Sequence, residues 1–325
     1  MTAAPTPDLA RLSPGDRVQD PFLVLDVETR GGDHPHTVLV LGNRSGTIPT
    51  APFWAEEQPK VAGITRRHVV QVIGEVALYR DQQQLRVSSI RVLPEGAVDP
   101  MTLLPSVGEV GRYWSYLDRM RGEIKPPRLR AVVDLFYEDP EFRTRYERCP
   151  ASTAGHHAAL GGLLKHTSEV VAIGLAIGRT SGADQDLVVA GALLHDIGKL
   201  EAYRWDGGFE PTPLNALIGH VVLGALMLDR VVRAQVEMPC TEAELSELLH
   251  LLLSHHGARE WGAPVPPLTL EAEVLHHADQ ASAKTASMGD AIREPGNFAG
   301  DALLSSRLRN SEGRKVYRGK NDWGA

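Results

Sequence analysis

The sequence predicts a two-part fold, in which a small all-β barrel is followed by an all-α helical bundle. At 325 residues the chain exceeds the usual size of one domain. Its first part carries short β-branched runs of alternating polarity, which indicate strands. Its second part has apolar residues at three- and four-residue spacing, which indicates amphipathic helices. We therefore expect a barrel domain, a helical connector, a helical domain and a polar basic tail over residues 1–94, 95–150, 151–290 and 291–325.

The barrel prediction depends on four strings separated by turn signals. They are FLVLDVETR, HTVLVLGNRSG, HVVQVIGEVALYR and QQLRVSSIRVL, with turns at Gly31–Gly32, Asn43–Gly46 and Asp81–Gln82. About five short strands within roughly 80 residues favour an OB-fold, the commonest small barrel of this size. Three aromatic side chains of this part could stack on nucleic-acid bases or, alternatively, close the core of the barrel. They are Phe53, Trp54 and Tyr79.

The connector and the second domain both have helical periodicity. The connector contains two helical strings, EVGRYWSYLDRMRGEI and PRLRAVVDLFYED, with Pro126 and Pro127 at the boundary between them. The arginines of these strings could guide a polyanion or form a solvated helix face. Thr241 and Glu244 have the spacing of a capping box, and Gly257 is placed to end the same helix. A bundle of about five further helices is expected between His156 and Met288.

Composition excludes several classes of protein. The net charge of −7 argues against a protein that grips duplex nucleic acid through a basic coat. Cys149 and Cys240 are far apart and lack CxxC spacing, so neither a disulfide framework nor a thiolate zinc site is expected. The start of the chain lacks the pattern of a signal peptide, and no apolar run has the length of a membrane span. These features predict a soluble cytoplasmic protein.

Histidine is concentrated in the second part of the chain, where ten of the 13 lie between His156 and His277. Five successive helical segments each contribute metal-capable side chains. These are His166, the pair His195–Asp196, His220, the pair His255–His256, and Asp279. The intervals of 29, 25, 35 and 24 residues each accommodate about one helix and a turn, so a bundle can bring all five to its centre.

The combination predicts a metal site, although a single histidine on an apolar face is more often a satisfied core residue. Burying several imidazoles and two carboxylates is unfavourable unless they are paired or coordinated. Histidine and carboxylate ligands without thiolate suit Mn²⁺, Fe²⁺, Co²⁺ or Zn²⁺, with Mg²⁺ as a further candidate. Of these we expect Mn²⁺ and two ions per site.

Five motifs resemble those of the HD-domain superfamily of metal-dependent phosphohydrolases. They are GGLLKHT, ALLHDIGKL, IGH, LLSHHG and LHHADQASAK. More narrowly, HHAALGGLLKHT, LSHHGAREWGAPVPPLTLEAEVLHHAD and DQASAK resemble the YhaM-type bacterial 3′-to-5′ exoribonucleases, which join an N-terminal OB-fold to an HD domain. The resemblance runs from about Leu12 to Lys284. It implies hydrolysis of single-stranded RNA, and DNA is a second candidate substrate. No membrane partner is implied, and a homo-oligomer is left open.

The resemblance also implies roles for individual residues. One metal would be held by His166, His195, Asp196 and Asp279. A second would be held by His220 and His255, with His256 as a further candidate and Asp196 as the bridge, since a carboxylate has two oxygens for two cations. Lys199 would hold the scissile phosphate, the alternative being a cation at a helix C-terminus. Four further residues are candidates for substrate contact or for packing. They are His156, His157, His276 and Lys284.

The chain departs from the family pattern at Ser282. The family closes with a sequence similar to DNLDAK, whereas this chain has DQASAK, which could alter substrate contacts while leaving Asp279 in place. Two other readings remain open, a phosphohydrolase of nucleotides or cyclic dinucleotides and a non-catalytic nucleic-acid-binding protein. The cyclic-dinucleotide reading is weakened because GAREWGAP follows His256 where a GYP motif would be expected, and the nucleotide reading leaves the barrel unexplained.

Overall fold

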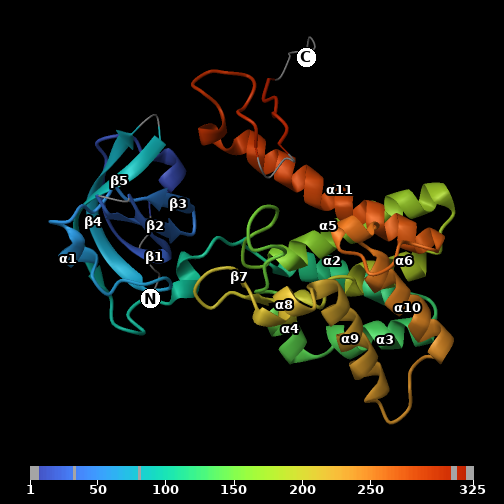
Figure 1. The fold of residues 1–325 in the computed structure, drawn as a ribbon. Coiled ribbons are helices and arrows are strands. Elements are labelled where there is room, and N and C mark those ends of the chain that lie inside the picture. Colours follow the sequence, from blue (N-terminus) through green and yellow to red (C-terminus); the bar gives the residue numbers. More distant parts are fainter. Residues whose placement is uncertain (1–6, 32–33, 80–81, 309–312, 320–325) are drawn as a thin grey trace. The chain divides into compact units, whose positions relative to one another are not determined.

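The fold of the chain was taken from a computed structural model, which describes residues 7–31, 34–79, 82–308 and 313–319 (Figure 1). The chain divides into two compact units. The first comprises Met1–Ser106 together with Trp205–Gly208, and the second comprises Val107–Arg204 and Phe209–Ala325. Gly32, Asp81 and parts of the expected tail lie outside the described residues.

The first unit is built on one antiparallel sheet of five strands in the order β3-β2-β1-β4-β5. The strands are β1 (Arg17–Arg30), β2 (His36–Asn43), β3 (Gly46–Pro49), β4 (Val69–Tyr79) and β5 (Gln82–Val92). The unit also contains η1 (Leu9–Arg11), α1 (Gln58–Val61) and η2 (Pro100–Leu103). Alternating residues of β4, among them Val70, Val72 and Val76, are buried in its core, as period-two patterning predicts.

The expected barrel is not a closed one in this structure. The edge strands β3 and β5 share no continuous ladder. Just beyond β3 there is an isolated parallel bridge between Thr50 and Leu85, and the Ala51 N–H donates to the Leu85 carbonyl at 2.9 Å. The hydrogen-bonded sheet is therefore open, with its two edges joined at a single point.

The expectation that Phe53 could be an exposed stacking residue is wrong. Its backbone exchanges hydrogen bonds with Thr37 at 2.8 and 3.1 Å, and its ring is only 2% exposed within the apolar core. Trp54 and Tyr79, in contrast, are 50% and 58% exposed. Only these two of the three predicted aromatic side chains are open to a ligand.

The second unit is helical. The helices before the metal-capable cluster are α2 (Gly111–Gly122), α3 (Pro127–Tyr137) and α4 (Pro140–Tyr146). The remaining helices are α5 (Gly162–Ser181), α6 (Gln185–Leu194), α7 (Lys199–Ala202), α8 (Pro213–Leu217), α9 (His220–Arg233), α10 (Glu242–Ser254) and α11 (Leu270–Arg293). Short elements complete it, namely the hairpin of β6 (Tyr203–Arg204) and β7 (Glu210–Pro211), η3 (Arg259–Trp261) and η4 (Pro295–Asn297).

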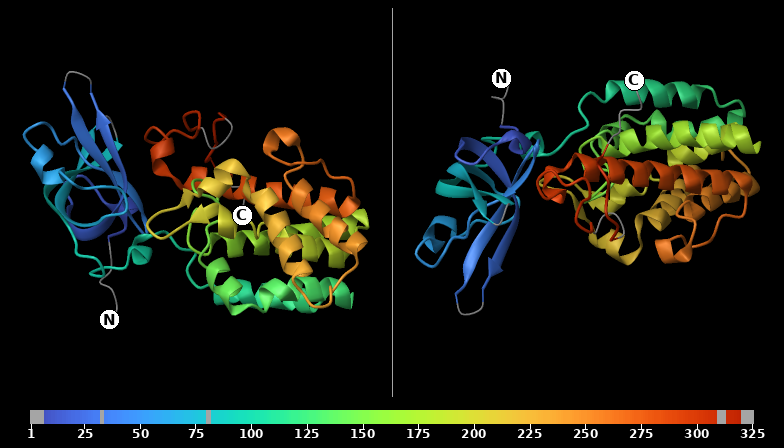
Figure 2. Two further views of the ribbon diagram at one scale, coloured as in Figure 1. Left: turned by 60° about the horizontal axis from the view of Figure 1, so that its bottom comes forward. Right: turned by 90° about the horizontal axis from the view of Figure 1, so that it is seen from above.

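Local sequence signals explain where the helices begin and how they pack. The capping box of Thr241 and Glu244 is present at the start of α10, and Asp184 caps α6 by accepting from two backbone N–H groups. Helix α11 lies along α5, while α5 in turn packs on α6 (Figures 1 and 2). This packing brings helix positions more than 100 residues apart in sequence into contact.

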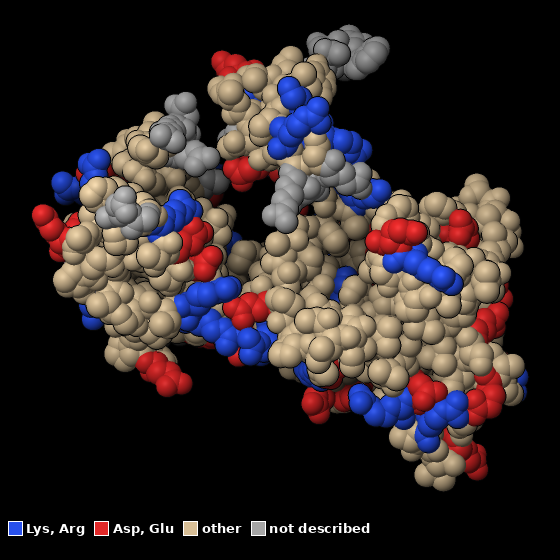
Figure 3. Space-filling model, in the orientation of Figure 1, with Lys and Arg blue, Asp and Glu red and all other residues tan. Residues whose placement is uncertain are grey.

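The surface of the second unit carries charges of both signs. On the face drawn in Figure 3, Lys and Arg side chains lie beside Asp and Glu side chains. Among the ion pairs of this unit, Arg233 bonds to Asp229 and to Glu242. Among the residues that the structure describes, no helix is both long and apolar enough to cross a membrane.

Candidate metal centre

The candidate ligands are delivered by five helices of the second unit. His166 lies within α5 and Asp279 within α11, whereas His195 and Asp196 directly follow α6. His220 is the first residue of α9, and His255 directly follows α10. Most residues of the cluster thus lie at helix ends. At a helix end the chain can turn polar side chains inward without interrupting an apolar helix face.

Gly198 allows the close approach that brings His220 to this point. A Cβ atom at Gly198 would lie 2.0 Å from the His220 carbonyl oxygen and 2.3 Å from the Gly224 backbone nitrogen. No side chain fits there, so the turn after Asp196 can pack directly on the first turn of α9 only with glycine. The sequence HDIGK therefore places the carboxylate of Asp196 beside a ligand 24 residues further on.

Asp196 is at the centre of the cluster and divides it into two halves. Its Oδ2 atom lies 3.2 Å from His195 Nε2 and 3.4 Å from His166 Nε2. Its Oδ1 atom faces the other side, 3.5 Å from His220 Nε2 and 3.8 Å from His255 Nε2. One carboxylate thus presents a separate oxygen to each pair of imidazoles.

Two groups of donor atoms are close enough to hold a metal ion. One consists of His166, His195 and Asp196, and the other of His220, His255 and His256, with ligand atoms within 4.8 Å of one another in each group. Asp279 adds Oδ1 at 3.0 Å from His166 Nε2. The structure therefore brings together all seven residues expected at the site.

The donor atoms fit a cation better than they fit one another. Within the described residues, the buried atoms Asp196 Oδ1, His220 Nε2 and His255 Nε2 have no hydrogen-bond partner. Such buried unpartnered groups are costly, and a divalent ion between them would satisfy all three. Nitrogen and carboxylate oxygen without thiolate is also a donor set that suits borderline first-row metals.

Backbone carbonyls fix the orientation of three imidazoles. The Nδ1 atoms of His195, His255 and His256 lie 2.8, 2.6 and 2.8 Å from the carbonyl oxygens of Ala192, Leu252 and Trp261. A carbonyl can only accept, so each Nδ1 carries the hydrogen and each Nε2 keeps its lone pair for the centre. These three carbonyl partners select the tautomer that a metal ligand needs.

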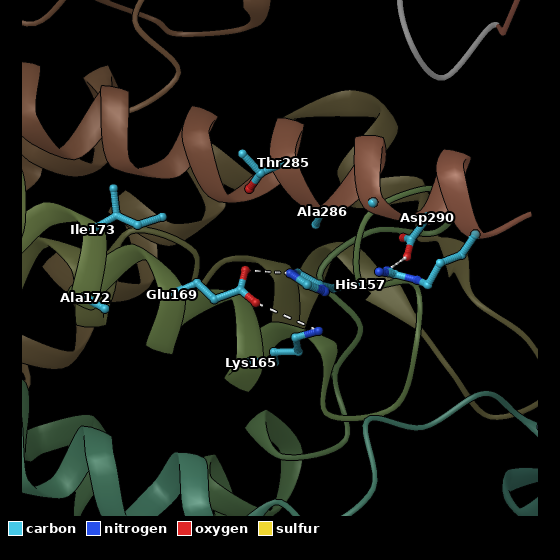
Figure 4. A pocket seen from close by; sticks show the side chains of 10 residues that line it. His157, Lys165, Glu169, Ala172, Ile173, Thr285, Ala286 and Asp290 are labelled. Atoms are coloured by element: carbon cyan, nitrogen blue, oxygen red, sulfur yellow. Dashed lines mark hydrogen bonds and ion pairs between the residues drawn. The ribbon is translucent and has the colours of Figure 1, made fainter. Parts of the chain in front are cut away.

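His166 is held differently, through a chain of side chains. Ser282 Oγ donates to Glu169 Oε2 at 2.7 Å and so accepts from His166 Nδ1 at 2.9 Å. Glu169 also pairs with His157 Nε2 at 2.8 Å (Figure 4). The hydroxyl of Ser282 thus connects a candidate ligand to Glu169, a carboxylate on the same helix as that ligand.

The protonation of these groups reflects burial and their neighbours. Burial opposes ionisation of Asp196, but Lys199 and His195 outweigh it and hold its pKa well below the ordinary value. Burial lowers the pKa of His220 to about 3 and lowers that of His255 as well, so both remain neutral. Burial also disfavours charge on His166, but hydrogen bonds to Asp196 and Asp279 raise its pKa.

Lys199, His156 and His276 lie beside this cluster. Lys199 Nζ lies 2.6 Å from Asp196 Oδ2, and its side chain is buried. His156 lies beside the His166 ring at 5.7 Å between centroids, and burial lowers its pKa to about 3. His276 is buried, with Nδ1 at 2.9 Å from the His255 carbonyl, whereas Lys284 is exposed. Phe53, Trp54 and Tyr79 belong to the first unit.

Two residues near the cluster were not anticipated from sequence. Glu169 follows His166 by three residues, which is the same-face spacing of a helix and could have drawn notice. Trp261 follows His256 by five residues and is 57% exposed, an unusual state for a tryptophan beside a buried polar cluster.

A buried cluster of histidine and aspartate at the centre of a helical unit is typical of one class of protein. Residues 163–284 match the family model of the HD domain. Over nearly its whole length it is also similar to proteins named 3′-5′ exoribonuclease YhaM. The identity is 28% over 313 residues with the protein of Bacillus subtilis (strain 168), covering 94% of this chain and 95% of the relative.

Two further relatives give the same result. The Oceanobacillus iheyensis protein is 29% identical over 309 residues, covering 92% of this chain and 93% of its own length. The Shouchella clausii protein is 29% identical over 316 residues, with 92% of each chain covered. Both bear the name 3′-5′ exoribonuclease YhaM, and the resemblance expected from the motifs is confirmed.

Proposed function

We propose that this protein is a metal-dependent 3′-to-5′ exonuclease that hydrolyses phosphodiester bonds of single-stranded RNA. The observation that carries the proposal is the position of Asp196, whose two oxygens each face a different pair of imidazoles. The names of the relatives, which align along nearly the entire chain, support RNA as the polymer and the 3′ end as the start. DNA is a second substrate to be tested.

The centre would hold two divalent ions. His166, His195, Asp196 Oδ2 and Asp279 form one ligand set, and His220, His255, His256 and Asp196 Oδ1 form the other. Mn²⁺ is the ion we favour, and Fe²⁺, Co²⁺, Zn²⁺ and Mg²⁺ are the alternatives to be compared. When bound, a pair of such ions lowers the pKa of water and neutralises charge on phosphoryl and leaving oxygens.

The protein's own residues prepare the site for this chemistry. Lys199 keeps Asp196 ionised through the 2.6 Å contact between Nζ and Oδ2, and the same ammonium adds positive charge that attracts a phosphoryl oxygen. The carbonyls of Ala192 and Leu252 hold the His195 and His255 rings with Nε2 toward the centre. Ser282 performs this task for His166, with Glu169 behind it.

The first unit would bind the strand as an OB-fold. Support comes from the strand order β3-β2-β1-β4-β5 and from the parallel Thr50–Leu85 bridge between the two edges, which is how a five-stranded Greek-key barrel begins to close. Trp54 and Tyr79 offer exposed rings on which successive bases could stack. This arrangement binds single strands with little preference for sequence, as an exonuclease requires.

A labelled single-stranded RNA and its DNA counterpart, incubated with a panel of metals and resolved by length, test the proposal. RNA labelled at its 5′ end should shorten progressively in Mn²⁺, and a blocked 3′ end should protect it. Asp196→Asn should abolish cleavage, whereas Asp229→Asn, which changes an exposed carboxylate paired with Arg233, should not. Strand binding without any cleavage in every metal would instead indicate a nucleic-acid-binding protein, and release of product only from free nucleotides would indicate a nucleotide phosphohydrolase.

A further inference from the structure

Trp261 is held in a fixed position next to the candidate metal centre. It ends the short helix η3, after which Gly262 adopts a left-handed conformation at φ +95° and closes the turn through a bond to the Arg259 carbonyl. The backbone carbonyl of Trp261 accepts from His256 Nδ1 at 2.8 Å. The residue is therefore one hydrogen bond away from a candidate ligand.

The indole ring of Trp261 packs against a histidine side chain. It lies nearly parallel to the imidazole of His276, with 5.8 Å between centroids and 23° between planes. His276 is buried, and its Nδ1 bonds the His255 carbonyl at 2.9 Å, so the supporting ring is itself anchored to the centre. Even so, 57% of Trp261 remains exposed. An indole ring held in this way offers exposed aromatic surface to a stacking ligand.

A cation accompanies this ring. Lys284 Nζ lies 5.9 Å from the indole centroid, and Lys284 follows Asp279 by five residues on α11. An aromatic face with an adjacent ammonium matches the two parts of a nucleotide, since the base offers a π-face and the phosphate offers negative charge.

We propose that Trp261 is the stacking platform for the nucleobase at the 3′ end of the strand, with Lys284 beside the neighbouring phosphate. This inference rests on the proposed exonuclease function and adds a subsite to it. Stacking uses the aromatic face that all four bases have. The subsite therefore binds a 3′ end with any base and binds an abasic 3′ end more weakly. The subsite keeps the terminal nucleotide beside the centre while the phosphodiester bond that joins this nucleotide to the strand is hydrolysed.

Two RNAs that differ only at the 3′-terminal residue, which is either an ordinary nucleotide or an abasic one, provide the test. Their affinities are measured by fluorescence anisotropy in the Asp196→Asn background with Mn²⁺ present. Because removal of one base stack weakens binding by about 5- to 150-fold, the Asp196→Asn protein should prefer the ordinary end by that factor. Adding Trp261→Ala should remove the preference, and adding Trp261→Phe should retain part of it. Tyr317→Ala, which removes another exposed aromatic ring, should leave it unchanged.

Mn²⁺ affinity of the Trp261→Ala protein separates a binding role from a structural one. The side-chain change leaves the backbone carbonyl that holds His256, so Mn²⁺ affinity should equal that of wild type. A preference for the ordinary end that survives Trp261→Ala would overturn the proposal, and so would weaker Mn²⁺ binding with equal loss for both RNAs. Hydrolysis is measured separately on the wild-type protein. A protein that distinguishes the two ends but cleaves neither RNA in any metal would refute the exonuclease function and leave the subsite intact.

Discussion

Ser282→Ala is the most informative single change, because it removes the hydroxyl that links His166 to Glu169. The substitution breaks the 2.9 Å contact with His166 Nδ1 and the 2.7 Å bond to Glu169 Oε2. His166 and Ser282 are 0% and 1% exposed, so water cannot readily replace the lost partner. Leaving one buried polar group unsatisfied costs about 1–3 kcal/mol. Loss of such an outer partner weakens metal binding by about 10- to 100-fold, and we expect that range for Mn²⁺.

Isothermal titration of Mn²⁺ into metal-free protein measures this effect directly. Ser246→Ala is the matched control, because it removes a helix hydroxyl that donates to the carbonyl of Glu242. Glu169→Gln keeps an acceptor oxygen for Ser282 and should weaken Mn²⁺ binding less than Glu169→Leu does. If Ser282→Ala binds Mn²⁺ as tightly as wild type while Ser246→Ala does too, the chain through Ser282 has no part in positioning His166.

Three further predictions concern other parts of the molecule. Burial raises the pKa of Glu169, but hydrogen bonds from His157 and Ser282 outweigh it, so the pKa is lower in the folded protein than in the unfolded one. The resulting stabilisation is present above the pKa of the unfolded state and is lost as the pH falls through the pKa of the folded state. Urea unfolding of metal-free protein should therefore show a larger difference between wild type and Ser282→Ala at pH 7 than at pH 3. Gly198→Ala should displace α9 and reduce bound metal, measured by elemental analysis, since its Cβ would meet the His220 carbonyl at 2.0 Å. Replacing both Trp54 and Tyr79 by alanine should weaken RNA binding by about 1–3 kcal/mol per stacked base without changing Mn²⁺ affinity.

The helical part of the fold was predictable because its signals are local. Apolar periodicity and the capping box of Thr241 and Glu244 define helices without knowledge of their neighbours. The spacing of the histidines and aspartates also indicated one cluster, since unpaired polar side chains in a bundle interior must meet one another or a metal. These residues do meet at Asp196 in the structure.

The features that escaped prediction depend on pairing between distant segments. Ser282 drew notice only for the carboxylate it lacks, because its contact with Glu169 spans 113 residues and requires knowing that α11 lies along α5. Phe53 reads as a surface aromatic until its backbone pairs with Thr37 and turns the ring inward. The isolated bridge between the edges of the open sheet likewise depends on Leu85 meeting Thr50, and strand periodicity does not specify which edges approach.

The proposal that two metal ions share the carboxylate of Asp196 is tested most directly by counting bound ions and measuring the coupling between them. Electron paramagnetic resonance of the protein titrated with Mn²⁺ should show two ions per chain with the spin coupling of a carboxylate-bridged pair. Asp196→Asn should lose that coupling and at least one ion. A single ion per chain, or two ions without coupling in the wild-type protein, would contradict the bridge.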